Sequence, residues 1–130
     1  MENKQTGERR NDLGWQIAPE GIYHVLKKAA KIGKPIYITE NGLPDAQDKS
    51  RGKFIIEHLI FLHRAISEGV DVRGYFYWSL LDNFEFVEMR GFWPRFGLVE
   101  VDYKTLERKI RPSAWEYAEI CKSNSLEPNS

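Results

Sequence analysis

Two glutamates stand where a folded chain could use them for acid, base or nucleophilic chemistry. Glu40 comes directly after a short apolar run at residues 35–39, and Glu85 lies in an aromatic segment beyond a second apolar run. A carboxylate that ends a buried parallel strand lies at the edge of the sheet where α/β proteins place ligands and catalytic groups. Two carboxylates at one such edge suit glycoside hydrolysis. The alternative for Glu40 is structural, because a glutamate here can also cap its loop or pair with a nearby arginine.

Aromatic residues gather around Glu85 in the sequence. They are Tyr75, Phe76, Tyr77, Trp78, Phe84, Phe86, Phe92, Trp93 and Phe96. Flat rings beside carboxylates favour a sugar ligand, because the C–H faces of a sugar pack on rings while its hydroxyls bond to carboxylates. Phe76 alternates along the second apolar run and is predicted to be core. Trp78, at the far end of that run, is the better candidate for a ligand contact.

No metal, cofactor, nucleic-acid or membrane site is predicted. His58 and His63 are five positions apart, so they do not share a helix face as a metal-binding pair would. Asp45 and Asp48 lack the spacing of a calcium loop and are interpreted as part of a solvated turn. Since 19 Lys and Arg residues balance 19 Asp and Glu residues, no basic surface favours nucleic acid or an anionic membrane. No glycine-rich phosphate loop occurs, so no nucleotide cofactor is expected.

Helices and strands alternate along the chain and must position these residues. Their spacing predicts a helix from Pro19 to Gly33, a strand at 35–39, a helix at 54–66, a strand at 72–81, a hairpin of 97–102 with 107–110, and a last helix from Ser113. In the helix at 54–66, the apolar face is predicted to comprise Ile55, Leu59, Leu62 and Ile66. The order strand, helix, strand predicts a parallel pair of the βαβ kind. Ser113 and Glu116 have the spacing of a capping box, and Trp115, Ala118 and Cys121 are predicted to share the apolar face of this helix.

Length and cysteine content limit the class of protein. With 130 residues, the chain is too short for a closed eight-stranded barrel, which takes roughly 250. We expect a polar leader at 1–11, one α/β unit at 12–124 and a frayed tail at 125–130. The single cysteine, Cys121, is predicted to be a small core residue. Because no signal-type or membrane-spanning apolar run occurs, the expected location is cytoplasmic.

The string Tyr37-Ile38-Thr39-Glu40-Asn41-Gly42 resembles the nucleophile signature of family 1 glycoside hydrolases, the β-glucosidases and β-galactosidases. Other motifs follow in the family's order: Gly14-Trp15, Pro19-Glu20-Gly21, GVDVRGYFYWSLLDNFE at 69–85, RFGLVEVDY at 95–103 and Arg111-Pro112-Ser113. The resemblance covers about residues 12–124. It implies an α/β fold that is the C-terminal portion of a (β/α)8 TIM barrel, about its last two βα units, with a small β-hairpin before the last helix.

The resemblance also implies a retaining β-glycosidase that hydrolyses terminal β-linked sugars through a glycosyl-enzyme on Glu40. By this resemblance Glu40 is the nucleophile and Trp78 stacks on the sugar. Glu85 accepts hydrogen bonds from the sugar hydroxyls, and Phe96 forms part of the wall of the sugar site. Phe86 stands where the family usually has a tryptophan, so an indole N–H donor is lost and the preferred sugar is in question. The loop after Glu85 is longer than usual, with Met89-Arg90 as the predicted extra residues. No cofactor is implied.

The family's acid/base carboxylate, carried in an Asn-Glu-Pro motif, does not occur in this sequence. We therefore expect the chain to be inactive alone on its expected partner, a β-glucoside or related small saccharide. Two alternatives to catalysis stay open, a carbohydrate-binding module and a structural remnant. Because two barrel strands leave open edges, the chain is also expected either to self-associate or to complement a separate chain that bears the rest of the barrel. The remaining hypothesis is that the chain belongs to a different kind of barrel enzyme, in which Glu40 acts as a base.

Overall fold

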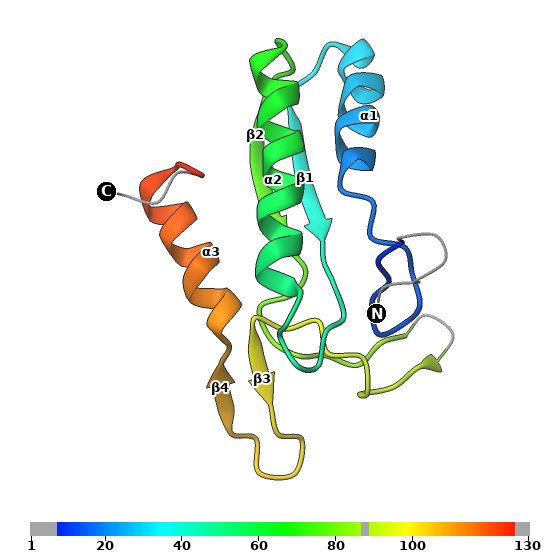
Figure 1. Cartoon of the computed structure of the whole chain (residues 1–130), viewed down its shortest axis with the longest axis vertical. Helices are drawn as coiled ribbons and strands as arrows, with labels where there is room; N and C mark the ends of the chain where they lie inside the picture. Colours follow the sequence, from blue (N-terminus) through cyan, green and yellow to red (C-terminus); the bar gives the residue numbers. More distant parts are fainter. Residues whose placement is uncertain (1–7, 87–88, 127–130) are drawn as a thin grey trace.

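A parallel pair of strands with a helical connection forms the centre of the structure. The computed structural model describes residues 8–86 and 89–126, so most of the predicted leader and the end of the predicted tail lie outside the described residues. β1 (Ile36–Asn41) pairs in parallel with β2 (Val72–Tyr77), and α2 (Arg51–Ser67) connects them. The predicted βαβ unit is thus confirmed. α1 (Glu20–Ala29) continues into a 3₁₀ turn at Ala30–Ile32 and packs against α2 (Figure 1).

The core lies between the sheet and the helices, because α2 presents one apolar stripe to the strands. Ile55, Leu59 and Leu62 recur at helical spacing and are buried, which confirms the predicted face of this helix. Ile66, predicted to extend the stripe, is exposed because it lies in the last turn of α2. Ile36 and Ile38 of β1 pack against this core. The sheet therefore has one well-covered face.

The opposite face of the sheet is bare within the described part of the chain. Tyr37 is 55% exposed and Phe76 is 58% exposed. The Tyr37 ring lies over Gly74, where an added Cβ would come within 2.7 Å of Tyr37 Cδ1. The prediction that Phe76 is a core residue is therefore wrong for this chain, because no described element covers its side of the sheet.

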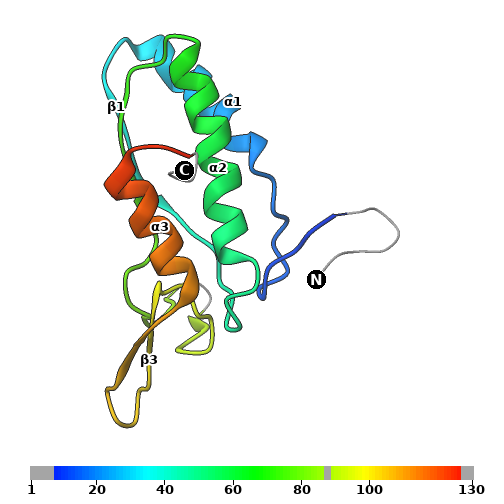
Figure 2. The same cartoon turned by 60° about the vertical axis from the view of Figure 1, so that its left-hand side comes forward.

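The second strand ends earlier than predicted. β2 stops at Tyr77, a cis peptide bond joins Trp78 to Ser79, and Leu81 forms a parallel bridge with Val99 instead of continuing beside β1. The predicted hairpin is confirmed as β3 (Val99–Val101) and β4 (Arg108–Ile110), which are antiparallel. Residues 78–81 thus lead from the sheet to the hairpin, which extends away from the helices (Figure 2).

The last helix, α3 (Pro112–Ser123), packs against α2 through a different face from the one predicted. Ala114, Tyr117 and Ile120 pack against the core, whereas the predicted residues Trp115, Ala118 and Cys121 are exposed. Each residue that packs against the core thus precedes the predicted one by one position, because contacts with α2 and β2 determine which face of α3 is covered.

The start of α3 is also held differently from the prediction. The predicted capping box is wrong: the helix begins at Pro112, and no side chain of its own caps it. Instead, Ser113 donates from its backbone N–H (2.9 Å) and from its hydroxyl (2.7 Å) to the distant carboxylate of Asp48. A carboxylate at a helix N-terminus accepts from otherwise unpaired N–H groups and opposes the positive end of the dipole.

A cluster of polar residues ties α1 to the end of α2 on the outside of the structure. Glu68 accepts a 2.6 Å hydrogen bond from the Tyr23 hydroxyl and pairs with Lys27 and Arg64, each at 3.2 Å. These donors, led by Tyr23, lower the pKa of Glu68 to about 2.

None of the helices within the described residues has the length and hydropathy that crossing a lipid bilayer requires.

One histidine is part of the core. His58 is buried on α2, its Nδ1 lies 2.7 Å from the carbonyl oxygen of Phe54, and its ring centroid is 3.9 Å from that of Phe54. Burial lowers the pKa of His58, because a charged imidazolium is poorly solvated there. The folded chain therefore holds this ring neutral.

We expect the free energy of unfolding to be highest above about pH 6.5, the usual pKa of histidine, and to decrease as the pH falls through the lowered pKa of His58. The unfolded chain binds a proton at this site that the folded chain resists. Urea denaturation at a series of pH values between about 5 and 7.5 measures the effect. This window lies above the one in which Glu68, with its lowered pKa, takes up a proton.

His58→Gln should flatten that pH dependence, whereas His63→Gln, at an exposed position of the same helix, should leave it in place. An equal slope in wild type and His58→Gln would contradict the assignment.

Candidate functional site

The carboxyl ends of β1 and β2 bring the main chains at Glu40 and Trp78 close together. Asn41 is opposite Tyr77 in the sheet, and the Trp78 N–H donates to the Asn41 carbonyl oxygen at 3.0 Å. Since parallel strands end at the same edge of a sheet, the candidate nucleophile and the candidate sugar-stacking residue come from neighbouring strand ends. Residues 78–86 and 89–98 lie beyond the arrowhead of β1 (Figure 1).

Glu40 is the unpaired acid at this edge. It is exposed, and within the described residues its carboxylate carries no hydrogen bond or ion pair. The structural alternative for Glu40 therefore has no support, because the side chain neither caps its own loop nor pairs with an arginine there. Glu40 borders a hollow of about 390 Å³ between α1 and β1.

The turn after Glu40 needs a residue without a side chain at position 42. A Cβ built on Gly42 would lie 1.9 Å from the carbonyl oxygen of Trp78. That distance is far inside van der Waals contact, and the atom met is backbone. Gly42 therefore lets the turn after β1 approach the start of the segment that carries Trp78.

Two tyrosines of β2 hold the same turn from within the sheet. The Tyr75 hydroxyl donates to Asn41 Oδ1 at 2.8 Å. The Tyr77 hydroxyl lies 3.2 Å from both the N–H and the carbonyl oxygen of Leu43 and accepts from Arg51 Nε at 3.1 Å. Burial raises the pKa of both hydroxyls, so they act as neutral hydrogen-bonding groups. Both tyrosines belong to the aromatic cluster of the sequence, but no role was predicted for either of them.

Arg51 joins the loop after β1 to the segment before Phe96. Its side chain is fully buried and donates to the carbonyl oxygens of Asp45 (2.6 Å) and Arg95 (2.7 Å). It also pairs with the carboxylate of Asp48. An arginine removed from water is stable only when its donors are paired. Here they have four partners: the two carbonyl oxygens, the Asp48 carboxylate and the Tyr77 hydroxyl.

The interpretation of Asp45 and Asp48 as a solvated turn is wrong. Asp45 is buried and accepts from the backbone N–H groups of Ser50 (2.7 Å) and Arg51 (3.1 Å), at the start of α2. Asp48 does the same for α3 and pairs with Arg51. Both carboxylates are buried because they satisfy helix N-termini that their own sequence neighbourhood does not reveal.

A third buried carboxylate, that of Asp82, fixes the loop that carries Glu85. Asp82 accepts two hydrogen bonds from Arg111, at 3.0 and 3.1 Å, and one from Arg95 at 3.2 Å. It also accepts from the N–H groups of Gly97 (2.9 Å) and Val101 (3.3 Å). Asp82 and Arg111 both lie in motifs that resemble those of the family, but residue spacing does not predict a pair between positions that are 29 residues apart.

The structure places the other predicted site residues on this anchored loop and around it. Glu85 is half-buried and exchanges two backbone hydrogen bonds with Gly91, at 2.7 and 3.1 Å. Phe86 is 77% exposed, and its ring centroid lies 5.0 Å from that of Phe84. Of the predicted loop extension, Met89 and Arg90 are described, whereas residues 87 and 88 lie outside the described part.

Phe96 differs from the other predicted contacts because its ring is buried. It lies 6.3 Å, centroid to centroid, from Trp15. Its carbonyl oxygen accepts from the Ser79 N–H at 3.4 Å. Backbone hydrogen bonds thus join Asn41, the neighbour of Glu40, to Trp78, and Ser79, the neighbour of Trp78, to Phe96. Glu85 and Phe86 lie on the neighbouring loop. Across residues 8–86 and 89–126, no three His, Cys, Asp or Glu side chains lie close enough to hold a metal ion.

The comparisons with known proteins agree on one family. The sequence profile of glycosyl hydrolase family 1 matches residues 1–126. A β-galactosidase of Sulfolobus acidocaldarius is 48% identical over 89% of this chain and 23% of its own length. β-Glucosidase A of Thermotoga maritima is 43% identical over 88% of this chain and 28% of its own length. The chain thus spans about a quarter of the length of the curated relatives it matches.

Solved structures match in the same way. The β-glycosidase from Pyrococcus horikoshii superimposes with a TM-score of 0.88 and 55% identity, over 93% of this chain and 28% of that one. The β-glucosidase from Thermotoga maritima in complex with glucoimidazole superimposes with a TM-score of 0.85 and 40% identity, over 91% and 29%. The arrangement of helices and strands in this chain is therefore that of one part of these larger enzymes.

Replacing Gly42 by alanine should destabilise the chain by about 1 to 3 kcal/mol, because the new methyl group meets the Trp78 carbonyl. Gly21→Ala is the matched control, since nothing lies within 4 Å of a Cβ at that helical position, and it should stabilise by about 0.5 to 1 kcal/mol. Denaturant midpoints of the two variants measure the difference. Equal midpoints would show that the close approach is not required.

Replacing Asp82 by asparagine should lower the free energy of unfolding by about 3 to 5 kcal/mol, because two guanidinium groups lose their shared buried carboxylate. The control is Asp71→Asn, which removes an exposed pair with Arg73 and should cost less than about 1 kcal/mol. Guanidinium chloride denaturation followed by tryptophan fluorescence reports both. Similar losses in the two variants would reject Asp82 as the anchor of the loop.

Proposed function

This chain belongs to glycosyl hydrolase family 1, and we propose that it carries the nucleophile half of a retaining β-glycosidase site. In this proposal the fold is about the last two βα units of a (β/α)8 barrel. The observation that supports it most is the unpaired Glu40 carboxylate at the common end of two parallel strands, next to the main chain of Trp78. Barrel enzymes place their catalytic groups at this end of the strands.

The proposed chemistry uses Glu40 in its ionised form. Its carboxylate oxygen attacks the anomeric carbon of a terminal β-linked sugar, and the bond to the leaving oxygen breaks as a second carboxylic acid protonates that oxygen. Water then attacks the glycosyl-enzyme, with the same second group now acting as a base, and Glu40 is released. Double displacement retains the configuration of the sugar. An exposed carboxylate without an ion pair is available for this attack.

The proposed sugar contacts come from the neighbouring loop. Trp78 would stack on the apolar face of the ring, Glu85 would accept hydrogen bonds from its hydroxyls, and Phe96 would wall the site. Phe86 has no polar group, so it would contribute only an apolar surface. The exposure of the Phe86 ring supports this contribution, because an exposed ring is accessible to a ligand.

The second carboxylate of this mechanism must come from outside the chain. In retaining enzymes the two carboxyl groups lie about 5 to 5.5 Å apart, and this chain has no Asn-Glu-Pro motif that would supply the acid. The matched relatives are about four times longer than the region they share with this chain. We therefore propose that the chain alone is inactive and that the missing barrel portion completes the site.

A second candidate function is carbohydrate binding without catalysis. It is favoured by the exposed rings of Trp78 and Phe86 near the strand ends, since aromatic surfaces bind sugars without any acid/base pair. Titration of cellobiose into wild type and into Trp78→Ala tests this candidate by calorimetry. Binding that Trp78→Ala weakens, with no turnover under any condition, would favour a sugar-binding module over an enzyme.

The cysteine content supports a cytoplasmic location as a further part of the proposal. Cys121 is the single cysteine of the sequence and is exposed as a free thiol. Free exposed thiols persist in reducing compartments.

We expect the purified chain to hydrolyse an aryl β-glucoside no faster than Glu40→Gln does, because neither contains the second carboxylate. When the portion of Thermotoga maritima β-glucosidase A that lies outside the matched segment is added, turnover should appear. Glu40→Gln should then reduce it on the order of 10³-fold or more, because the nucleophile is lost. Release of the aryl group, followed by absorbance, is the measurement.

Glu119→Gln, at an exposed position on α3, is the control and should keep the rate within about twofold. Steady turnover by the chain alone that Glu40→Gln abolishes would disprove the need for a second carboxylate from outside. A complemented rate that Glu40→Gln leaves unchanged would disprove the role of Glu40.

A further inference from the structure

β1 contains an irregularity directly before Asn41. Ile38 lies opposite Tyr75 in the sheet, and Asn41 lies opposite Tyr77. Between these two pairs β1 advances by three residues and β2 by two, so β1 holds one extra residue, a β-bulge, at positions 39–40. Bulges change the direction of a side chain and are frequent beside active sites. The proposed nucleophile therefore lies in the one part of the strand end that departs from regular pairing with β2.

The exposure of the side chains follows this bulge. Ile36 and Ile38 pack against the core, Thr39 and Glu40 are both exposed, and Asn41 is half-buried again. Side chains alternate between the two faces of a regular strand, so an uninterrupted β1 would turn Glu40 to the same face as Ile36 and Ile38. Since a shift of one residue moves a side chain to the opposite face, the extra residue accounts for the exposure of Glu40.

Asn41 closes the bulge and is held twice by β2. Its carbonyl oxygen accepts from the Trp78 N–H at 3.0 Å, and its Oδ1 accepts from the Tyr75 hydroxyl at 2.8 Å. Tyr75 is also the residue opposite Ile38, where the bulge begins. The same tyrosine thus contacts the strand on both sides of Glu40, through its backbone position before the bulge and through its hydroxyl after it.

Tyr75 is itself fixed in place. Its half-buried ring packs against the core, and its carbonyl oxygen accepts from the hydroxyl of Tyr117 of α3 at 3.2 Å. The two rings meet edge to face with centroids 6.1 Å apart. Burial raises the pKa of the Tyr75 hydroxyl, so this group stays protonated and donates to Asn41. The donor therefore has a fixed position and a fixed protonation state.

Tyr77 acts further along the chain. Its hydroxyl bonds to the backbone of Leu43, in the turn beyond the bulge. The Tyr75 hydroxyl instead reaches the residue that directly follows Glu40. Of the two tyrosines, Tyr75 is thus the one whose contact can set the direction of the Glu40 side chain.

We infer that Tyr75 is a positioning residue for the nucleophile: by holding the side chain of Asn41 it fixes the bulge, and with it the direction in which Glu40 points. The inference rests on the proposed function and adds to it a residue that acts through another. A misplacement of about 1 Å in a reacting group can slow a reaction on the order of 100-fold. Loss of this one hydrogen bond should therefore affect the attack by Glu40 more than it affects the fold.

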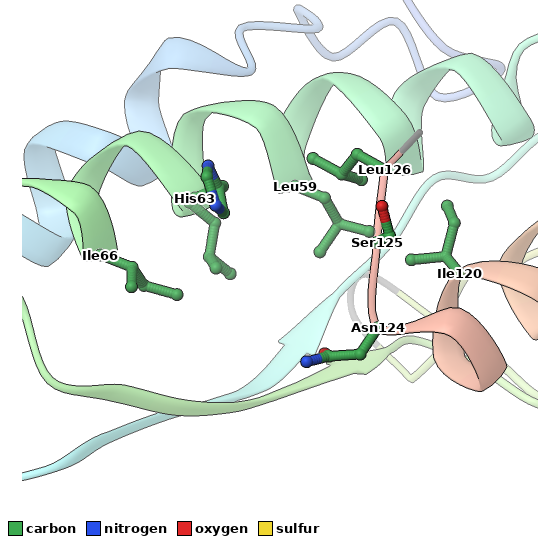
Figure 3. Close-up of a pocket in the computed structure, with 8 residues that line it drawn as sticks. Leu59, His63, Ile66, Ile120, Asn124, Ser125 and Leu126 are labelled. Atoms are coloured by element: carbon green, nitrogen blue, oxygen red, sulfur yellow. The ribbon is translucent and has the colours of Figure 1, made fainter. Parts of the chain in front are cut away.

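Packing elsewhere in the molecule supplies a comparison for a purely structural change. A hollow of about 430 Å³ lies between α2 and α3, and Leu59, Ile120 and Leu126 are among the residues that line it (Figure 3). Ile120 packs against the core through an apolar side chain. Ile120→Val removes one methylene from this packing, which costs stability of the same order as the loss of one hydrogen bond.

The test uses the whole chain and dinitrophenyl β-glucoside. A Glu40 carboxylate oxygen bonds to the anomeric carbon while the bond to the aryl oxygen breaks, and that oxygen leaves with the electron pair as a stable phenolate. No acid is needed for this step. Because the chain has no Asn-Glu-Pro motif to supply the base that activates water, the glycosyl ester should persist. Mass spectrometry of the intact chain and of its peptides should then find one glucosyl group, on Glu40.

Tyr75→Phe and Asn41→Leu should each slow the labelling of Glu40 at saturating glucoside about tenfold and leave the half-saturating concentration within about twofold. The double variant should be no slower than either single variant, because both remove the same hydrogen bond. Hydrogen exchange of the Trp78 N–H should become about tenfold faster in the same variants, since its acceptor is the carbonyl of Asn41. Ile120→Val, the control, should change neither rate by more than about twofold.

Thermal melting checks that each variant is folded at the assay temperature. Equal slowing of labelling by Tyr75→Phe and Ile120→Val overturns the inference, as does a double variant whose loss is the product of the two single losses. A wild-type chain that takes up no label on Glu40 counts against the proposed function instead. Exchange of the Trp78 N–H then decides the inference: faster exchange in Tyr75→Phe than in Ile120→Val supports it, and an equal rate in the two variants overturns it.

Discussion

The carboxylate of Asp82, buried and shared between two arginines, is the interaction on which the site end of this molecule depends. Arg111 comes from the start of α3 and Arg95 from the segment before β3, so one acid joins the segment after β2 to the hairpin and the last helix. Arg51 has the equivalent role at the start of α2. It pairs with Asp48 in the loop after β1 and donates to the Arg95 carbonyl oxygen, so it joins that loop to the segment before β3. Charges removed from water are stable only with complete sets of partners, so these contacts allow little freedom to the loops that they hold.

Those two anchors explain how irregular segments can present functional groups at fixed positions. The turn after Glu40 and the segment after Tyr77 have no regular secondary structure, yet Gly42 and the Trp78 carbonyl meet at close range. Loops carry function well when a rigid scaffold positions them. In this chain the scaffold is a pair of buried charge networks and two tyrosine hydroxyls, while the candidate nucleophile itself is left without a partner.

The second constraint is the incompleteness of the sheet. Two parallel strands with helices on one face bury Ile36 and Ile38 but leave Tyr37 and Phe76 in solvent. Membership of glycosyl hydrolase family 1, together with a match to about a quarter of each relative, gives this exposure a physical meaning. The prediction that Phe76 is core failed because alternation along β2 does not say whether another element covers that side of the sheet, and none of the described elements does.

By itself, the sequence determined the elements whose cause is local or periodic. The apolar spacing of Ile55, Leu59 and Leu62 was enough for α2, the β-rich run before Glu40 was enough for β1, and the motif around Glu40 was enough for the family. Only the tertiary structure decided the partners of Asp45, Asp48 and Asp82, the packed face of α3, and the early end of β2. These features depend on contacts between residues up to 65 positions apart, and a charge in the sequence does not reveal which distant backbone or guanidinium group will satisfy it once it is buried.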